Sequence, residues 1–360
     1  MAFRTNKTPV LQEKSASGSV ASFNTALAMP LASCNIAINA YQEGTGEPSP
    51  VNVRNIVPRR EVNIYQRGIN LWDEQWELGT YNTTTGEKAN STTNIRSTNK
   101  IPVIPNTNYC FVIDYVSTIV VGIILKYDVN GDFIGIMSWY GGARVTNIPN
   151  DTHYLTFYLG TGYGTTYNNN ISINYPSTDT SYHAYNGNDY LVNLGEDVYG
   201  AVYNSVTGGK KKTVNKVVLN GTENWNERAA SNGYYITLSD MKPQTAGNGL
   251  CNWLKRVTSL TGTMGIQWGA GNNKAIYAID VNSIEGVTNV TTWKAYLEQH
   301  PLEVTYELET PIESTGTPTP INTFNGDNNI FCDTGDTSLT YKDLDIAKRG
   351  NFREVFKLPS

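Results

Sequence analysis

Two aromatic and polar segments carry the residue types that bind sugars. One is Trp139-Tyr140-Gly141-Gly142-Ala143-Arg144, and the other is Tyr163-Gly164-Thr165-Thr166-Tyr167-Asn168-Asn169-Asn170. A sugar presents apolar C–H faces and a ring of hydroxyls, so its site needs an aromatic platform with hydrogen-bonding groups at the rim. The candidate glycan-binding residues are Trp139, Tyr140, Arg144, Tyr163, Tyr167 and Asn168. The same pattern also fits a core tryptophan beside a tyrosine-rich loop that is only solvated or contacts another subunit.

Other motifs that could carry chemistry fail on spacing. Asp128-Val129-Asn130-Gly131-Asp132 begins like a calcium loop, but Phe133 and Trp139 stand where that loop needs its Gly and its bidentate Glu. The segment is therefore predicted to be a hairpin turn. Gly208-Gly209-Lys210-Lys211-Lys212-Thr213 lacks the spacing of a phosphate loop and is interpreted as a short cationic hairpin tip.

Catalytic and metal signatures are also missing from the sequence. The three histidines have no Cys or carboxylate at ligand spacing, so we expect no metal site and no cofactor. No G-x-S-x-G segment is present, and we predict that the chain is not an enzyme. A glycan-degrading enzyme remains the least favoured alternative, because a catalytic carboxylate pair is a spatial feature that spacing does not reveal.

The composition indicates strands and excludes several classes of protein. Only 16% of the 360 residues are charged, while 23 are Tyr and 32 are Gly. The net charge of -5 argues against nucleic-acid binding, which depends on Lys and Arg at phosphates. No apolar stretch approaches the roughly 20 residues that span a bilayer, and the N-terminus lacks the apolar core of a signal peptide. The four cysteines are scattered and are predicted to be buried thiols.

The sequence contains short segments in which apolar and polar residues alternate, separated by turn residues. The pattern predicts an all-β chain of tandem jelly-roll-like β-sandwiches. One short helix is expected near 292–300, with Thr291 or Thr292 as its N-cap and Pro301 after its end. Trp293, Tyr296 and Leu297 would share its buried face.

Five segments are expected along the chain. They are an N-terminal arm at 1–30, connecting strands at 31–69, a first β-sandwich at 70–190, a second β-sandwich at 191–342 and a C-terminal attachment peptide at 343–360. The arm is small and polar, so it is either a floppy terminus or a docking tail that gains order from a partner.

Scattered motifs resemble a family of phage and prophage minor structural proteins. They are Gln42-Glu43-Gly44-Thr45-Gly46-Glu47-Pro48-Ser49-Pro50-Val51-Asn52-Val53-Arg54-Asn55-Ile56, Gly68-Ile69-Asn70-Leu71-Trp72, Val198-Tyr199-Gly200-Ala201 with Thr207-Gly208-Gly209, Tyr306-Glu307-Leu308-Glu309-Thr310-Pro311, and Asn328-Asn329-Ile330-Phe331-Cys332-Asp333-Thr334-Gly335-Asp336. The resemblance covers roughly residues 15–342. Members of this family are tail, baseplate or capsid-surface proteins with domains similar to carbohydrate-binding modules.

The resemblance implies a location and a set of partners. We expect a non-enzymatic virion protein that is made in the bacterial host cytoplasm and displayed on the particle. Its expected partners are other virion proteins, further copies of itself in a homo-oligomer such as a trimer, and host-surface glycans. Neither nucleic acid nor membrane insertion is expected. A purely architectural capsid decoration or head-fibre protein without a ligand is the alternative.

Overall fold

The computed structural model describes residues 11–18, 20–25, 28, 30–113, 120–160, 170–245, 247–334 and 337–344. Antiparallel sheets make up most of these residues, and α1 (Val290–Gln299) is the one α-helix among them. The predicted all-β fold with a single short helix is confirmed. The chain divides into two compact units, which consist of Met1–Ile36, Asn63–Val192 and Thr319–Ser360 (unit 1) and of Ala37–Val62 and Asn193–Pro318 (unit 2).

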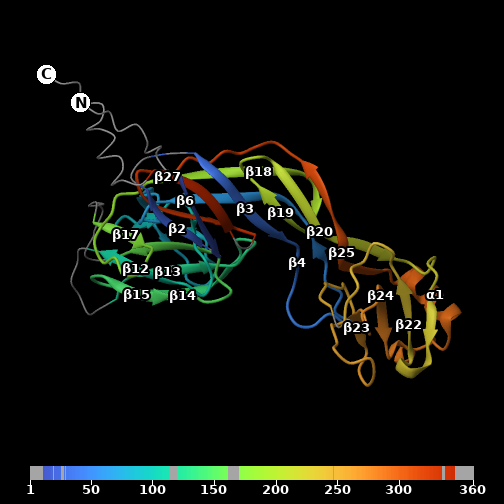
Figure 1. Cartoon of the computed structure of the whole chain (residues 1–360). Helices are drawn as coiled ribbons and strands as arrows, with labels where there is room; N and C mark the ends of the chain where they lie inside the picture. The colour runs from blue at the N-terminus through green and yellow to red at the C-terminus, as the bar shows by residue number, and fades with distance from the viewer. Residues whose placement is uncertain are drawn as a thin grey trace, which may run out of the picture. The chain divides into compact units, whose positions relative to one another are not determined.

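Unit 1 contains a β-sandwich built from two sheets (Figure 1). The larger sheet, here called the first sheet, has the strand order β14 (Phe133–Tyr140), β13 (Val120–Tyr127), β16 (Tyr154–Leu159), β10 (Ile95–Ser97) and β7 (Trp76–Leu78), with β11 (Ile101–Pro102) also paired to β16. The smaller sheet has the order β15 (Arg144–Asn147), β12 (Asn108–Ile113) and β17 (Ile171–Asn174). A separate hairpin consists of β8 (Thr80–Tyr81) and β9 (Lys88–Ala89).

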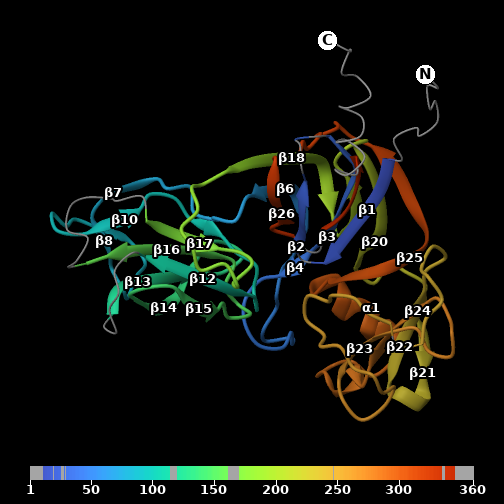
Figure 2. The same ribbon diagram turned by 60° about the vertical axis from the view of Figure 1, so that its left-hand side comes forward.

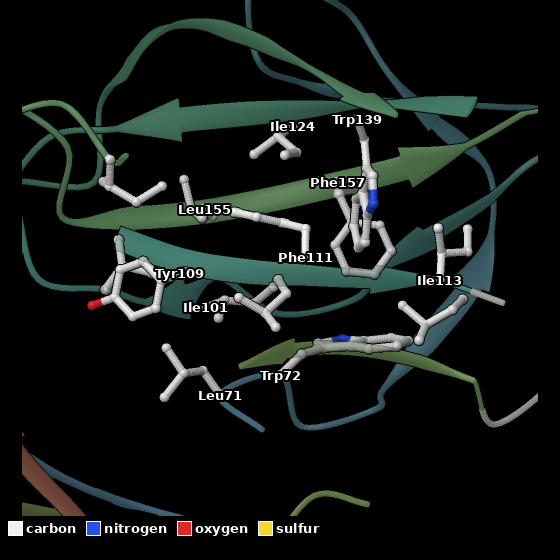
Figure 3. Packing of buried hydrophobic residues seen from close by; sticks show 14 of the residues in the cluster. Leu71, Trp72, Ile101, Tyr109, Phe111, Ile113, Ile124, Trp139, Leu155 and Phe157 are labelled. Carbon is white, nitrogen blue, oxygen red and sulfur yellow. The ribbon is translucent and has the colours of Figure 1, made fainter. Parts of the chain in front are cut away.

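Aromatic rings from both sheets fill the sandwich core (Figure 3). Trp139 of β14 contacts Phe111 of β12 and Phe157 of β16 edge-on, with ring centroids 5.3 and 4.9 Å apart. Trp72 packs against Phe157 in the same way, at 4.8 Å. Edge-to-face packing places the positive edge of one ring on the negative face of the next, which favours these contacts beyond burial alone.

The turn between β13 and β14 is built by its first residue. The Asp128 carboxylate accepts hydrogen bonds from the backbone N–H groups of Asn130 and Asp132, both at 2.9 Å. Gly131 has a φ of 83°, a conformation that glycine adopts without the steric cost of a Cβ. The segment is therefore the predicted hairpin turn, closed by its own aspartate side chain.

The described part of the expected N-terminal arm forms paired strands. β1 (Leu11–Gly18) pairs with β27 (Thr337–Leu344), and β2 (Val20–Thr25) pairs with β26 (Gly326–Cys332). Residues 11–18 and 20–25 are thus paired strands, which does not fit a floppy terminus over these residues. A polar segment gains strand structure when a partner strand supplies its backbone hydrogen bonds, and here that partner is the end of the same chain.

The other domain boundaries also differ from those expected. Unit 2 ends at Pro318, and the chain then returns to unit 1, so 191–342 is not one continuous domain. Residues 343 and 344 of the expected attachment peptide belong to β27, and 345–360 lie outside the described residues. The connecting region 31–69 contains four strands, which are β3 (Leu31–Asn39), β4 (Tyr41–Gln42), β5 (Ile56–Val57) and β6 (Arg59–Arg67).

Unit 2 packs a helix and long strands against a four-stranded sheet (Figure 2). The sheet has the order β21 (Asn226–Arg228), β22 (Gly233–Thr237), β24 (Ala275–Ile279) and β23 (Gly265–Trp268). The remaining strands of the described chain are β18 (Gly187–Val198), β19 (Gly200–Asn204), β20 (Gly209–Leu219) and β25 (Leu302–Thr315), and β20 pairs with both β19 and β25. Short 3-10 turns occupy Ala229–Ser231 and Val281–Ser283.

The N-cap of the helix lies two or three residues before the expected Thr291 or Thr292. Asn289 is the N-cap, and its side chain accepts hydrogen bonds from the backbone N–H groups of Thr291 and Thr292, both at 3.0 Å. Thr292 completes a capping box through its own hydroxyl. Trp293 and Leu297 are fully buried, so the predicted packing face is confirmed.

The four cysteines were predicted to be buried thiols, and the structure agrees for three of them. Cys34, Cys110 and Cys251 are buried, Cys332 is partly buried, and none of the four is in a disulfide bond. Burial raises the pKa of the Cys251 thiol to about 12, so this sulfur remains protonated and unreactive near neutral pH.

Replacing Trp293 tests the core of unit 2. This ring stacks on Tyr234 at 5.7 Å and meets Trp225 edge-on at 5.5 Å. Trp293→Ala is expected to lower the free energy of unfolding by about 3–5 kcal/mol, measured by urea titration. Glu298→Ala, at an exposed position of the same helix, should change it by less than about 0.5 kcal/mol. Equal effects of the two variants would contradict the packing described here.

Candidate functional site

The outer face of the first sheet carries an aromatic and polar row. The strand register places Ile123 of β13 opposite both Ser138 of β14 and Tyr158 of β16. Tyr158 in turn pairs with Arg96 of β10, and Arg96 pairs with Glu77 of β7. Residues paired across antiparallel strands share one face of a sheet. These five side chains therefore form a row across five strands, which we call the outer row.

Strand alternation separates this row from the core. In β16, Leu155, Phe157 and Leu159 are buried in the sandwich, and so the residues between them, including Tyr158, point to the opposite face. In β14, Trp139 is buried while Ser138 is exposed. The same period of two thus places one set of side chains inside and the outer row outside.

The β8–β9 hairpin covers only part of this outer face. Tyr81 of the hairpin is buried against Leu125 and Tyr127, and the Tyr127 hydroxyl donates to the Gly86 carbonyl oxygen at 3.2 Å. Ile123 and Tyr158 pack against this cluster and are partly buried, while Ser138 is exposed. The outer row therefore presents one partly buried aromatic ring, that of Tyr158, at the margin of the hairpin.

Arg96 is held in place at the end of the outer row. Its Nε donates to Glu77 Oε1 at 3.0 Å, and its terminal nitrogen donates to the carbonyl oxygens of Thr80 and Ala89, both at 2.7 Å. Gly79 has a φ of 149°, and a methyl group at this position would lie 2.6 Å from the Arg96 guanidinium carbon. Only glycine therefore lets the backbone approach the guanidinium so closely.

Two cations act on the Glu77 carboxylate. Lys88 Nζ lies 2.7 Å from Glu77 Oε1, and Arg96 donates to the same oxygen. The hydrogen bonds from Lys88 and Arg96 hold the pKa of the Glu77 carboxyl below its ordinary value. The carboxylate is thus ionised near neutral pH, and it offers hydrogen-bond acceptors to a ligand on this face.

The combination suits a polyhydroxylated ligand. Tyr158 supplies an aromatic surface for apolar C–H groups, and Ser138 and Glu77 supply hydrogen-bonding groups in the same row. No cluster of three or more His, Cys, Asp or Glu side chains able to hold a metal ion occurs in the described part of the chain.

Trp139 is a core residue and is not part of a surface platform. Its side chain is only 1% exposed and lies between Phe111 and Phe157 (Figure 3). The ring is therefore unavailable for stacking on a ligand, which corrects the expectation for this residue. The reason is strand alternation, because residue 139 has the inward parity of β14.

Tyr140 and Arg144 are exposed but belong to different sheets. Tyr140 ends β14 in the first sheet and is 44% exposed, with the outward parity of Ser138. Arg144 begins β15 in the smaller sheet, after the short turn at 141–143. Tyr140 is a diagonal neighbour of the outer row, because it lies two residues beyond Ser138 on the same face. Arg144 reaches the solvent at the rim of the sandwich instead.

The other expected glycan-binding residues cannot be placed. Tyr163, Tyr167 and Asn168 lie outside the described residues. Sequence reasoning missed Tyr158 and the Arg96–Glu77 pair. A signal for Tyr158 was present, because Tyr154, Thr156 and Tyr158 alternate with three apolar residues. No signal linked Arg96 to Glu77, since only strand pairing brings them together.

The lysine run is not an open cationic surface. Lys210 is buried, with its Nζ 2.5 Å from Glu196 Oε1 and 3.0 Å from the Leu194 carbonyl oxygen. Lys212 contacts the other oxygen of Glu196 at 2.7 Å. The predicted hairpin is present, because β19 and β20 pair directly across this turn. The lysines lie at the start of β20, and Glu196 forms ion pairs with Lys210 and Lys212.

Comparisons with known proteins find no match for this chain. No protein-family model, no curated protein and no solved structure matches it. Within the described residues, no helix is both long and apolar enough to pass through a bilayer.

The Glu77 ion pairs give a pH-dependent contribution to stability. Because the folded-state pKa of Glu77 is lowered, its contribution is present above the unfolded pKa and is lost as pH falls through the folded pKa. Glu77→Gln should therefore be less stable than the parent at pH 7, and the difference should shrink toward zero at acidic pH. Urea titrations between pH 7 and pH 3 measure this, with Glu87→Gln on the exposed hairpin turn as the control. A difference independent of pH would contradict the ionic origin.

Proposed function

We propose that this chain is a non-enzymatic structural protein of a bacteriophage particle, displayed on the particle surface, that binds glycans of the host cell. The family resemblance of its sequence motifs supports the virion role. The outer row of the first sheet supports the glycan-binding part of the proposal, because it combines a partly buried tyrosine with fixed hydrogen-bonding groups.

The motif at the start of the resemblance supports contact with other virion proteins. Arg54 anchors this loop, because its guanidinium donates hydrogen bonds to several backbone carbonyl oxygens, among them those of Glu43 and Gly44 at 2.7 Å each. Val51 at the tip of the loop is 98% exposed, and Val53 is 60% exposed. An apolar tip on a loop with a fixed backbone loses little conformational entropy when it docks.

The glycan site works through many weak contacts. Tyr158 and Tyr140 stack on sugar rings, Ser138 and Glu77 accept hydrogen bonds from hydroxyls, and Arg96 holds Glu77 in its orientation. A shallow surface with few fully desolvated polar contacts binds weakly, with a dissociation constant of about 1 mM for a single copy. Display of many copies on one particle raises the effective affinity by roughly 10²–10⁴.

One observation favours a second candidate function. The burial of Trp139 removes the largest ring from the expected platform. A purely architectural decoration or head-fibre protein needs no platform at all, and its exposed surfaces serve only assembly. The architectural function becomes the better explanation if replacing the tyrosines of the first sheet has no effect on adsorption.

The virion role predicts where the protein is found. Mass spectrometry of gradient-purified phage particles should detect the chain at a fixed copy number relative to the major capsid protein. Antibodies against the purified chain should label intact particles, because a displayed protein is accessible from outside. Detection only in the lysate, after the particles have been removed, would contradict the proposal.

The glycan role predicts a selective loss of binding. Tyr158→Ala and Tyr140→Ala should each weaken binding of the full chain to bacterial-surface polysaccharides on an array by roughly two- to tenfold, because each loses a stacking ring. Tyr199→Ala removes a half-buried tyrosine of unit 2 and is the matched control, with binding unchanged. Thermal melts verify that all three variants fold. Unchanged binding by both platform variants would contradict the glycan role and favour the architectural one.

A further inference from the structure

One end of the four-stranded sheet of unit 2 is hollowed. Asn232 precedes β22, Asp280 follows β24 and Met264 precedes β23, and antiparallel pairing of these strands brings the three residues to the same end (Figure 2). The hollow has a volume of about 410 Å³, within the range of roughly 300–1,000 Å³ that small-molecule sites have. The side chains that line it are those of Asn232, Thr263, Met264, Asp280, Asn282 and Ser283.

The Asp280 carboxylate in this hollow lacks a partner. Its Oδ2 atom is buried and accepts no hydrogen bond, and no ion pair compensates its charge in the described part of the chain. A carboxylate oxygen that leaves water without gaining a donor destabilises the folded chain. A molecule that brings hydrogen-bond donors into the hollow would remove this cost.

Two turns hold the hollow in a strained conformation. Asn232 has a φ of 45° and Asp280 a φ of 52°, in the left-handed region that residues other than glycine rarely adopt. The Asp280 N–H donates to the Ser231 carbonyl oxygen at 2.9 Å, and the Asn282 N–H donates to the Asn232 carbonyl oxygen at 3.3 Å. Backbone strain of this kind is concentrated at ligand sites, where the surrounding structure maintains it. The hollow is therefore formed before any ligand arrives.

The core of unit 2 orients the Asn282 amide. The Tyr234 hydroxyl donates to Asn282 Oδ1 at 2.7 Å, and the Tyr234 ring is buried and stacks on Trp293. Because Oδ1 accepts this bond, the other end of the amide, Nδ2, is the donor that remains for a ligand. Ser283 Oγ donates to the Asp280 carbonyl oxygen at 2.6 Å and keeps lone pairs that can accept.

We propose that this hollow is a second carbohydrate site, which binds one neutral sugar ring through its hydroxyls. A hydroxyl can donate to the Asp280 carboxylate and also accept from Asn282 Nδ2, so it satisfies both groups. The partly buried Met264 side chain, with Sδ 3.9 Å from Ser283 Oγ, supplies a polarizable apolar contact for the C–H face of the ring.

The lining disfavours charged ligands. An anion would meet the uncompensated charge of Asp280. A metal ion would find one carboxylate, because Asp280 is the only acidic side chain among the described residues that line the hollow, and it would face the N–H donor of Asn282. A neutral polyhydroxylated ligand has neither disadvantage.

The hollow can be tested separately from the outer row. The hollow belongs to unit 2 and the outer row to unit 1, and Met264 provides a local probe. Labelling with [methyl-¹³C]methionine gives signals from the five methionines of the chain, and Met264→Leu assigns the signal of Met264. Methyl glycosides of glucose, galactose, mannose, rhamnose and N-acetylglucosamine should include at least one that shifts this signal saturably. Tyr158→Ala should leave this titration unchanged, whatever its effect on the outer row.

Two isosteric variants test the roles of the polar groups. Asp280→Asn should raise the dissociation constant of that glycoside about tenfold or more, because a charge-assisted hydrogen bond is lost. Its thermal midpoint should stay equal or rise, since Asn tolerates the left-handed conformation and the uncompensated charge is removed. Asn282→Asp keeps the acceptor for Tyr234 but removes the N–H donor, and it should weaken binding similarly. Asn272→Asp, the same change at another left-handed residue of unit 2, is the control with unchanged binding.

Three results would overturn the proposal. The first is a Met264 signal that none of the glycosides shifts at concentrations up to about 100 mM, well above the dissociation constant of a weak sugar site. The second is an Asp280→Asn variant that binds the glycoside as tightly as the parent. The third is a Met264 signal that calcium chloride shifts and the glycosides do not, which would identify a metal site instead.

Discussion

The edge-to-face packing of Trp139 with Phe111 and Phe157 sets what the first sheet presents to its surroundings. Side chains alternate across a strand with a period of two, so burying Trp139 turns Ser138 and Tyr140 outward. A slip of one residue in the register of β14 would expose the tryptophan and bury the polar residues. The outward position of Ser138 and Tyr140 follows from the burial of this one ring.

The two units build their cores in different ways. The sandwich of unit 1 closes its core with a second sheet, from which Phe111 and Ile173 point inward. Unit 2 uses α1 and the long strands β20 and β25 over its four-stranded sheet, with Trp293 at the centre of an aromatic cluster. A short helix can replace strands here because its two fully buried residues, Trp293 and Leu297, lie on one face.

The charged end of the outer row combines a structural and a chemical role. The Arg96 guanidinium joins the hairpin carbonyls of Thr80 and Ala89 to Glu77 of β7. Its charge is compensated, and most of its surface is buried. Glu77 keeps a partly exposed carboxylate, which is the group that a ligand reaches. Rigid support behind an accessible acceptor lowers the entropic cost of binding a flexible ligand.

Local sequence patterns alone were sufficient to predict the all-β fold, the hairpin turn at 128–132, and the helix with its buried face. These features depend on residues close in sequence, such as the Asp128 side chain and the spacing of Trp293 and Leu297. The parity of β16 was also readable, so Tyr158 could have been identified as an outward residue. The start of the helix was misplaced because the N-cap is Asn289, although all three polar residues there can cap.

Only the tertiary structure decided which strands lie next to each other. The pairing of β1 with β27 and of β2 with β26 joins residues about three hundred positions apart, and nothing in the small polar N-terminal segment specifies its partner. The Arg96–Glu77 pair and the burial of Trp139 depend equally on strand order. Sequence determined what each segment can form, because local preferences act within a few residues. Strand order required the tertiary structure, because it is set by how all the apolar faces are buried together.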